Sequence, residues 1–391
     1  MQHYKNILLI VLSLFLLVAC NPQPEAPELL EQAQLLMEDH PDSALLLIDS
    51  IFYPEKSLSK HDYMYYQVAK VQAKYKTYRP VKDDTLIFEA RRYFAKHNKD
   101  LEKTTLAHFY SGAVYRDKNH YDKAMQAYKD AATIAQKTND PDLKGIVQYN
   151  IGDLLLQYNL IDEAQDAYKK AEQFYGQSLK NAEEKQIKCL SAVGRMFLML
   201  GKPDSTFFYL HKGLKLAEET ENIELQSHLM QNLSITYREA KEYNKAEDLL
   251  SQSFLLNNDS VEEVRYYLNF ANLYSLMGEN DSVTVYKNKL LRSIDRLDDI
   301  YFKASAYNFL ADWGKENQNY EEAINYQDKR MRLLLHIMEK ERQQSVYEVQ
   351  KKYDYAKFQN QHNQTLLSRQ KIIVASLLLL LLFSFVVVFL F

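Results

Sequence analysis

Two uninterrupted apolar runs lie at the two ends of this chain, and about three hundred residues of mixed apolar and polar character lie between them. The first run, residues 7–18, follows Lys5 and ends in small residues, and it is too short to span a bilayer comfortably. These features are typical of a secretory signal, here residues 1–19. The second run, residues 372–391, carries no charge, and twenty residues at about 1.5 Å each match a hydrocarbon core of about 30 Å. The pattern predicts an exported middle region followed by a transmembrane helix.

The middle region is expected to be helical nearly throughout. It is poor in turn residues, since the whole chain has nine Gly and eight Pro, and Ala, Leu, Glu, Lys and Gln are plentiful, which favours helices over strands. The net charge of −4 and the absence of a Lys and Arg run give no basic field for a polyanion. We therefore predict an all-α chain that does not bind nucleic acid through this segment.

Small residues recur along the middle region at intervals of about 40 residues. The spacings are 40, 42, 40, 37 and 40 for the series Gly112, Gly152, Gly194, Ser234, Ala271 and Ala311. A large residue follows most of them three residues later, and a second small residue follows most of them twelve residues later: Ala124, Ala164, Thr206, Ala246 and Ala323. A further large and small pair follows in the first four copies, as in Tyr128 with Ala131. Each copy predicts two helices that approach at the small residues, with large side chains filling the space beside them.

This arrangement resembles the tetratricopeptide repeat (TPR), a helix-turn-helix unit with small residues at its eighth, twentieth and twenty-seventh positions and aromatic residues at its eleventh and twenty-fourth. The copies that match best are YSGAVYRDKNHYDKAMQAYKDA, residues 110–131, and NIGDLLLQYNLIDEAQDAYKKA, residues 150–171. Helices longer by about a turn account for a period near 40 instead of 34. The last two copies are degenerate, because Val283 replaces a small residue and Gly314 replaces an aromatic one.

The resemblance implies a TPR-like superhelix, an α-solenoid whose repeats stack through their apolar faces. We expect about eight hairpins. Degenerate hairpins cover residues 28–100, with Asp42 or Ser43 as a helix cap after Pro41, and a superhelix of about six repeats covers residues 101–335.

In TPR proteins the first helix of each pair lines the concave surface, so the resemblance also nominates groove residues. At the corresponding positions stand Arg116, Tyr149, Asp153, Arg195, Gln231, Arg238, Arg265, Asn272, Asn308, Asp312 and Lys315. They do not repeat the Lys and Asn clamp with which some TPR proteins hold a carboxylate terminus. A protein or peptide ligand is predicted. The alternative is that these are ordinary solvated side chains.

No pattern of catalytic or metal-binding residues stands out. The chain has no HExxH, no phosphate-binding glycine loop, no GxSxG, and no His or Cys pair at metal spacing. We expect no enzymatic activity, no cofactor and no metal. Of the two cysteines, Cys189 lies in the apolar stretch IKCLSAVGRMFLML and is predicted to be a buried structural thiol.

The other cysteine, Cys20, ends the sequence Leu17-Val18-Ala19-Cys20. This tetrapeptide resembles the bacterial lipobox, in which the cysteine is lipidated and becomes the new amino terminus. Residues 20–27 then form a polar, proline-bearing tether to the folded region. An ordinary signal peptide with a coincidental cysteine is the alternative.

Five short strings of Asp followed by Ser or Thr resemble the acceptor for O-linked glycan that some Gram-negative bacteria use on exported proteins. The acceptor residues would be Ser43, Thr85, Ser205, Ser260 and Ser282. Most of these strings also begin a predicted helix, where Asp and Ser cap free amide groups. Capping is therefore the competing explanation.

Residues 336–371 are expected to continue as a juxtamembrane helix into the span. A heptad seam from Val346 to Leu367 contains several polar members, so it predicts at most a weak homodimer. The export signal places the repeats in the periplasm, anchored to the inner membrane of a bacterial cell envelope. If the amino-terminal segment were not an export signal, the chain would be a tail-anchored cytoplasmic adaptor.

Two functions remain open at this stage. One is a membrane-anchored TPR scaffold that binds protein or peptide partners. The other is the sensor half of a transmembrane signalling or transcriptional regulator. The second follows from the charge pattern around the span: Arg369 and Lys371 lie on its outer side, against the usual bias. Longer relatives would then continue into a cytoplasmic output domain that this sequence lacks.

Overall fold

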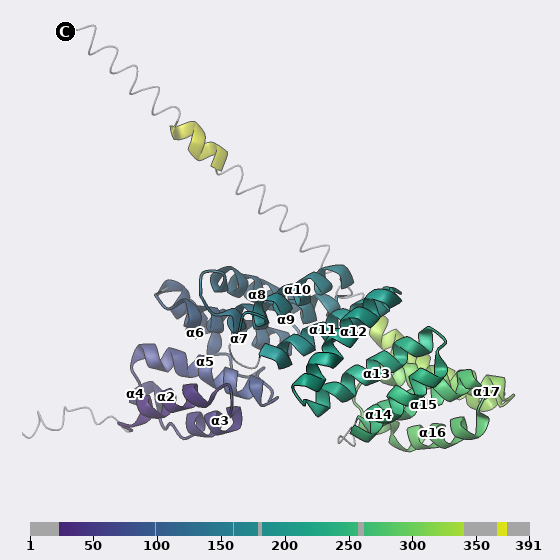
Figure 1. Ribbon diagram of the computed structural model, residues 1–391. Coiled ribbons are helices and arrows are strands. Elements are labelled where there is room, and N and C mark those ends of the chain that lie inside the picture. Colours follow the sequence, from purple (N-terminus) through teal and green to yellow (C-terminus); the bar gives the residue numbers. More distant parts are fainter. Residues whose placement is uncertain are drawn as a thin grey trace, which may run out of the picture. The chain divides into compact units, whose positions relative to one another are not determined.

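The computed structural model describes residues 23–97, 99–158, 160–178, 182–256, 262–339 and 366–373, and over these ranges the regular secondary structure is helical (Figure 1). The chain divides into two compact units, Met1–Asn258 and Asp259–Phe391. The boundary falls inside the region predicted as one superhelix. Each unit is described by itself.

The first unit consists of consecutive antiparallel pairs. Its helices are α2 (Ala26–Leu36), α3 (Pro41–Asp49), α4 (Pro54–Ser57), α5 (Lys60–Lys76), α6 (Ile87–Lys96), α7 (Leu101–Asp117), α8 (Tyr121–Ala135), α9 (Pro141–Gln157), α10 (Ile161–Tyr175), α11 (Ala182–Met199), α12 (Pro203–Glu219), α13 (Ile223–Glu239) and α14 (Tyr243–Leu256). The pairs follow one another along the unit, each second helix packing against the next first helix. The short α4 stands between the first two pairs.

The second unit is also built of paired helices. It contains α15 (Glu263–Met277), α16 (Asn280–Ser293), the 3-10 turn η1 (Ile294–Arg296), α17 (Ile300–Glu316), and helical segments 320–339 and 366–373. With the first unit, the described residues form eight helical pairs, as expected. The first helices from α7 to α17 have 15 to 18 residues, which accounts for a repeat longer than 34.

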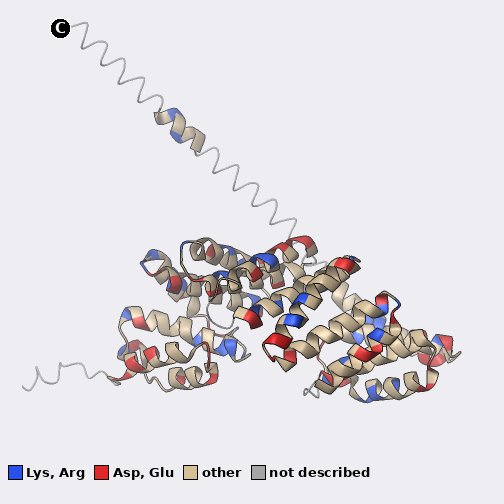
Figure 2. Cartoon of the chain, in the orientation of Figure 1, with Lys and Arg blue, Asp and Glu red and all other residues tan. Residues whose placement is uncertain are grey.

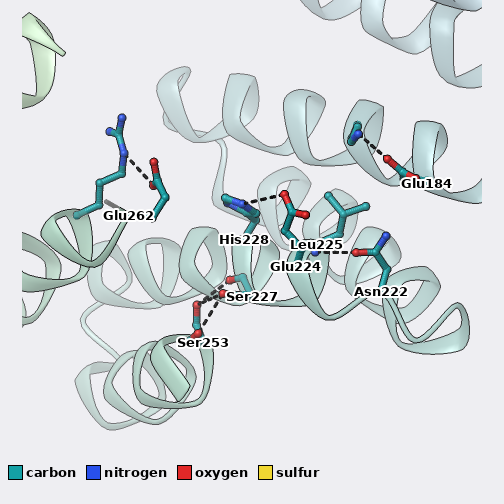
Figure 3. Close-up of polar contacts among 10 residues, drawn as sticks. Glu184, Asn222, Glu224, Leu225, Ser227, His228, Ser253 and Glu262 are labelled. Carbon is teal, nitrogen blue, oxygen red and sulfur yellow. Dashed lines mark hydrogen bonds and ion pairs between the residues drawn. The ribbon is translucent and has the colours of Figure 1, made fainter. Parts of the chain in front are cut away.

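Polar side chains mark the start of several first helices. Asp100, Asp140 and Asn222 accept hydrogen bonds from the backbone N–H groups of Lys103, Leu143 and Leu225 at 2.9, 3.0 and 3.0 Å, the last drawn in Figure 3. These bonds satisfy amide groups that have no partner inside the helix. The predicted cap of α3 is wrong. The helix begins at Pro41, the N-cap position is His40, and no side chain caps it, because proline at the first position leaves one fewer amide to satisfy.

A left-handed residue ends most of the first helices at a fixed place in the repeat. Positive φ values occur at Asn119 (59°), Gly201 (64°), Lys241 (62°), Gly278 (77°) and Gln318 (60°), each seven residues after the first small residue of its repeat. The N–H group of the next residue donates to the carbonyl five residues earlier, as from His120 to Tyr115 at 2.8 Å. This is the Schellman geometry, which closes a helix and turns the chain sharply into its partner.

The predicted pairing of small and large residues is confirmed. A Cβ built on Gly112 would lie 2.5 Å from Cε1 of Tyr128, and one on Gly152 would lie 2.9 Å from Cε1 of Tyr168. Gly194 and Leu210 make the same pair in the third copy at 2.5 Å. Each large side chain therefore packs directly on the backbone of the first helix.

Serines take the place of the small residues in the pair α13 and α14, where they form hydrogen bonds. Ser227 Oγ donates to the carbonyl of Ser253 at 3.0 Å, and Ser253 Oγ donates to the carbonyl of Ser227 at 2.7 Å (Figure 3). Ser234 Oγ donates to the carbonyl of Ala246 at 2.7 Å. The close approach of the two helices is thus fixed by polar contacts as well as by size.

The degenerate copies keep this packing in the second unit. Val283, which replaces a small residue, is fully buried beside Ala271 and Leu290. A Cβ on Gly314 would lie 3.2 Å from the backbone nitrogen of Ala323, so α17 and segment 320–339 approach at the backbone. A departure from the repeat pattern therefore does not prevent a helical pair.

The predictions for the two ends of the chain fall largely on residues outside the described ranges. These are the signal peptide 1–19, Cys20, most of the tether 20–27, residues 340–365 of the juxtamembrane helix, and residues 374–391 of the transmembrane helix. The predicted tether extends too far, since α2 begins at Ala26. No helix in the described ranges is both long and apolar enough to cross a bilayer.

Candidate functional site

A buried amide links three consecutive first helices of the first unit. Asn150 Oδ1 on α9 accepts hydrogen bonds from the hydroxyl of Tyr75 on α5 at 2.7 Å and from Nη1 of Arg116 on α7 at 3.1 Å. Its Nδ2 donates to the carbonyl of Ile146 at 2.9 Å. One side chain thereby fixes the spacing of α5, α7 and α9.

Asp153 lies one turn further along α9. Burial raises the pKa of its carboxyl above the ordinary 3.8, although the hydrogen bond from the Tyr168 hydroxyl and the positive charges of Arg116 and Arg195 oppose the rise. The Tyr168 hydroxyl donates to Asp153 Oδ1 at 2.7 Å. The ring of Tyr149 packs edge-on against that of Tyr168, with 5.2 Å between centroids, and burial raises the pKa of Tyr149.

The structure therefore brings three predicted groove residues together, namely Arg116, Tyr149 and Asp153. Arg195 is exposed on α11, yet its charge acts on Asp153. The Nη1 atom of Arg116 and the Oδ1 atom of Asp153, however, are engaged in hydrogen bonds inside the protein. This cluster serves first to join repeats, and a role in binding a partner stays a prediction.

Two further groove residues lie on α13. The Nε2 atom of Gln231 is buried and has no hydrogen-bond partner among the described residues. Arg238 is paired with its neighbour Glu239 at 2.9 Å.

The other predicted groove residues lie in the second unit and make local contacts. Arg265 pairs with Asp299 and with Glu262, each at 3.0 Å, the latter shown in Figure 3. Asn272 Nδ2 donates to the carbonyl of Leu268 at 2.9 Å. Asn308 Nδ2 donates to Asp312 Oδ2 at 3.0 Å, and Asp312 and Lys315 are exposed.

A pocket of about 250 Å³ opens near the buried amide, on the amino-terminal side of α7 and α9 and along α5. Its apolar and aromatic lining consists of Met37, Tyr65, Leu106, Tyr110, Leu143, Ile146 and Tyr175. Its polar lining consists of Gln34, Glu38, Gln72, Lys76, Glu102, Asp140, Asp142 and Lys185. All of these residues belong to the first unit.

Four of the lining residues are buried but leave a polar group without a protein partner. Tyr65, Gln72, Tyr110 and Tyr175 are 4%, 7%, 1% and 5% exposed. None of their side chains makes a hydrogen bond to any residue in the described ranges. Their hydroxyl and amide atoms are not among the fully buried polar atoms that lack a partner in the described ranges, so these atoms open to the pocket and are available to a ligand.

The charges around the pocket are unequal. Lys76 pairs with Glu38 at 2.9 Å, and Lys185 pairs with Asp142 at 2.7 Å. The carboxylates of Glu102 and Asp140 line the pocket without a salt bridge to any described cation; Asp140 caps α9. The pocket therefore carries an excess of negative charge.

Sequence reasoning missed this pocket, although the repeat length held a signal. The TPR correspondence places the first repeat position at Thr105 and Gly145, whereas α7 and α9 begin at Leu101 and Pro141. The extra turn contributes Glu102 to the pocket from α7, and Asp142 with Leu143 from α9. Some of the six additional residues per repeat therefore line the pocket.

The candidate glycan acceptors differ in exposure. Ser43 and Thr85 are exposed, Ser205 and Ser282 are half-buried, and Ser260 lies outside the described residues. Ser43, Ser205 and Ser282 are each the third residue of a helix that has no side-chain cap. Capping does not explain their place, and modification stays a prediction.

Two other chemical expectations concern metals and thiols. Within the described ranges, no group of three or more His, Cys, Asp or Glu residues is arranged to hold a metal ion. Cys189 is fully buried and unpaired, as predicted, and burial raises the pKa of its thiol.

Lys and Arg are interspersed with Asp and Glu along the helices (Figure 2).

Comparison with known proteins agrees with this architecture. Residues 108–138, which span α7 and α8, match the tetratricopeptide repeat family. A stretch of 72 residues is 35% identical to the transcriptional activator NprA of Geobacillus stearothermophilus, and it covers 18% of each protein. The chain thus matches less than a fifth of the length of that relative.

Similar solved structures come from Rap proteins. The apo form of RapI has a TM-score of 0.63 at 14% identity, over 81% of this chain and 99% of that one. A Rap protein complexed with competence and sporulation factor has 0.56 at 14%, over 81% and 99%. Aspartyl phosphate phosphatase F from Bacillus subtilis has 0.52 at 13%, over 80% and 94%. The chain is a TPR-containing protein with an all-α, TPR-like solenoid fold.

Proposed function

We propose that this chain is a membrane-anchored TPR scaffold that binds a protein or peptide partner through the first helices of its first unit and catalyses no reaction. The observation that carries the proposal is the pocket, where four largely buried side chains expose polar groups that make no hydrogen bond to any residue in the described part of the chain. A bound segment would supply the missing partners.

The size of the pocket favours a peptide over a whole small molecule. Pockets for drug-sized ligands usually have volumes of about 300–1,000 Å³, and this one has about 250 Å³. It would hold one or two side chains of a segment that continues along the helices beyond it. The fold supports this use, since one solved Rap protein of similar fold is complexed with competence and sporulation factor.

The proposed location rests on the sequence of the two ends. A signal at residues 1–19, lipidation at Cys20 and an apolar span at residues 372–391 would hold the repeats in the periplasm of a bacterial cell, on the inner membrane. A lipid chain combined with a membrane span anchors a protein firmly.

A peptide-retention experiment tests the binding function. The full chain, purified in detergent and immobilised, is incubated with a library of random dodecapeptides, and retained peptides are sequenced. We expect selective retention that Leu106→Trp abolishes, because the larger side chain fills the pocket. Ile223→Trp, at an exposed position of α13, is the matched control and should retain the same peptides. No selective retention, or equal retention by the two variants, would contradict the proposal.

The alternative function is the periplasmic sensor portion of a transmembrane signalling or transcriptional regulator. It is favoured by the local match to a transcriptional activator. The genomic sequence after codon 391 distinguishes the two. An open frame with Lys and Arg followed by a helix-turn-helix pattern would favour the sensor, and a stop codon would favour the scaffold.

A further inference from the structure

Three tyrosines on three helices contribute to the walls of the pocket. Tyr65 lies on α5, Tyr110 on α7, and Tyr175 at the end of α10. The ring of Tyr175 is held against Gly145, where an added Cβ would lie 2.5 Å from its Cε1 atom. Tyr110 is fixed between Tyr75 and Phe109, with centroids 5.8 and 4.9 Å away. The Tyr110 and Tyr175 rings are therefore positioned by contacts within the first unit.

Two of these rings already contact cations of the protein itself. Lys103 Nζ lies 4.8 Å from the centre of the Tyr65 ring, and Lys185 Nζ lies 5.5 Å from the centre of the Tyr175 ring. Both lysines are also paired with carboxylates, Lys103 with Asp100 at 3.3 Å and Lys185 with Asp142 at 2.7 Å. Aromatic faces in this region attract positive charge. The nearby carboxylates also outnumber the lysines that neutralise them.

The groups left for a ligand can all accept hydrogen bonds. The lining contains four carboxylates and two ammonium groups, and each ammonium group is bound to one carboxylate. The remaining carboxylates belong to Glu102 and Asp140. Tyrosine hydroxyls and the Gln72 amide oxygen can accept as well. An anionic ligand would be repelled, whereas a cation with several donors would be held.

We propose that the pocket binds a cationic side chain of a partner peptide, arginine in preference to lysine. The inference rests on the proposed binding function and names its chemistry. Arginine has five N–H donors in a planar fork and no acceptor, whereas the lysine ammonium group has three. The fork can reach a carboxylate and a tyrosine hydroxyl at once, and the aliphatic stem packs on Leu106 and Ile146.

Peptide pools with one fixed residue test this preference. Four pools of dodecapeptides are random except for a central Arg, Lys, Gln or Glu, and each is passed over the immobilised full chain in detergent. We expect the Arg pool to be retained about tenfold more than the Gln pool, followed by the Lys pool, with the Glu pool retained least; tenfold corresponds to about 1.4 kcal/mol. The preference should shrink as salt is raised.

Two variants with a matched control connect the preference to the pocket. Glu102 is exposed and lies in the first turn of α7, so Glu102→Gln should fold normally and reduce retention of the Arg pool about fivefold. Tyr110→Phe removes one acceptor and should reduce it by a similar factor. Glu163→Gln makes the same change in the first turn of α10, outside the pocket lining, and should have no effect. Circular dichroism melts check that each variant is folded.

The outcomes distinguish the preference for a cationic side chain from the proposed peptide-binding function. Equal retention of the Arg and Gln pools overturns the cationic preference, while retention that Leu106→Trp abolishes still supports peptide binding. A fall of equal size in Glu102→Gln and Glu163→Gln indicates general attraction to an acidic protein and also overturns the preference. Retention of no pool overturns the proposed function itself.

Discussion

The ring of Tyr128 occupies the space next to Gly112 that a Cβ atom would need. A Cβ there would lie 2.5 Å from Cε1 and 2.6 Å from Cδ1 of Tyr128. The ring is fully buried, and its hydroxyl has no hydrogen-bond partner among the described residues. Neither the ring nor the backbone of α7 can move without disturbing the core of the first unit.

Gly112→Ala should therefore destabilise the first unit by about 1–3 kcal/mol, the usual cost of overpacking. The control is Gly213→Ala, since its new Cβ would lie 3.1 Å from Leu229 Cδ2. Alanine also favours a helix by about 0.5–1 kcal/mol over glycine, so Gly213→Ala should be close to neutral. Urea unfolding followed by circular dichroism measures both. Equal midpoints would mean that the ring of Tyr128 can move aside.

The left-handed turn residues give a second prediction. Lys241 has φ 62° and Gly201 has φ 64° at the same place in two repeats, and both are exposed. A non-glycine residue in this conformation costs about 1–2 kcal/mol. Substitution by glycine removes that cost, but the greater freedom of glycine in the unfolded chain offsets part of the gain in stability. Lys241→Gly should raise the free energy of unfolding by about 0.5–1 kcal/mol.

The reverse change provides the control for that prediction. Gly201→Ala introduces a Cβ that meets no atom within 4 Å, so any loss of stability reports backbone strain alone. We expect a loss of about 1 kcal/mol. If neither variant differs from the parent chain in urea, the turns do not hold the left-handed conformation.

The buried carboxyl of Asp153 predicts a dependence of stability on pH. Burial raises its pKa above 3.8, so between 3.8 and the folded value the folded chain binds more protons than the unfolded chain. The contribution of this group to stability is therefore greatest in acid and falls as pH rises through that window. Asp153→Asn, which keeps an acceptor for Tyr168, should remove this fall in melts between pH 4 and 7.

Asp299 is the matched control for Asp153, because the pKa of its carboxyl is shifted in the opposite direction. Burial acts to raise its pKa, but hydrogen bonds from the Phe302 N–H group and Arg265 outweigh it and lower the pKa below 3.8. Its contribution is present above 3.8 and is lost as pH falls through the folded value. Asp299→Asn should cost stability at pH 7. If the two variants show the same pH profile, the assigned environments are wrong.

Anchoring is tested by labelling and by fusion. Cys20→Ser should abolish incorporation of labelled palmitate, whereas Cys189→Ser should not, because Cys189 is fully buried. Alkaline phosphatase fused after residue 335 should be active, since that enzyme needs export. Unchanged palmitate labelling in Cys20→Ser would remove the lipid anchor. An inactive fusion would indicate a tail-anchored cytoplasmic adaptor instead.

The register of the repeats was readable from the sequence because size alone sets it. Gly152 and Tyr168 are sixteen residues apart, as are Gly112 and Tyr128, and each pair meets in the structure. The left-handed turns were not predicted, since Asn119, Lys241 and Gln318 share a conformation that glycine adopts in other repeats. Backbone geometry at these positions is set by the closure of the helix and not by the residue type.

The groove was harder to predict for a different reason. Position in the repeat nominated Arg116 and Asp153 as groove residues, but it did not indicate that Asn150 and Tyr168 would bond to their polar atoms. Hydrogen-bond partners come from neighbouring repeats, and a single repeat pattern contains no information on them. The pocket residues Tyr65 and Gln72 lie on α5, in the region where the repeat pattern is degenerate.

The burial of Cys189 makes its thiol a reporter of helix separation. Cys189 packs with Ala171 and Tyr175, and the chain has two cysteines, so the variant Cys20→Ser carries one thiol. A thiol reagent can reach that sulfur only when α10 and α11 separate. Because Tyr175 also forms a wall of the pocket, a peptide bound there should slow the reaction. The rate of thiol labelling, measured with and without a bound peptide, would then report how often α10 and α11 separate.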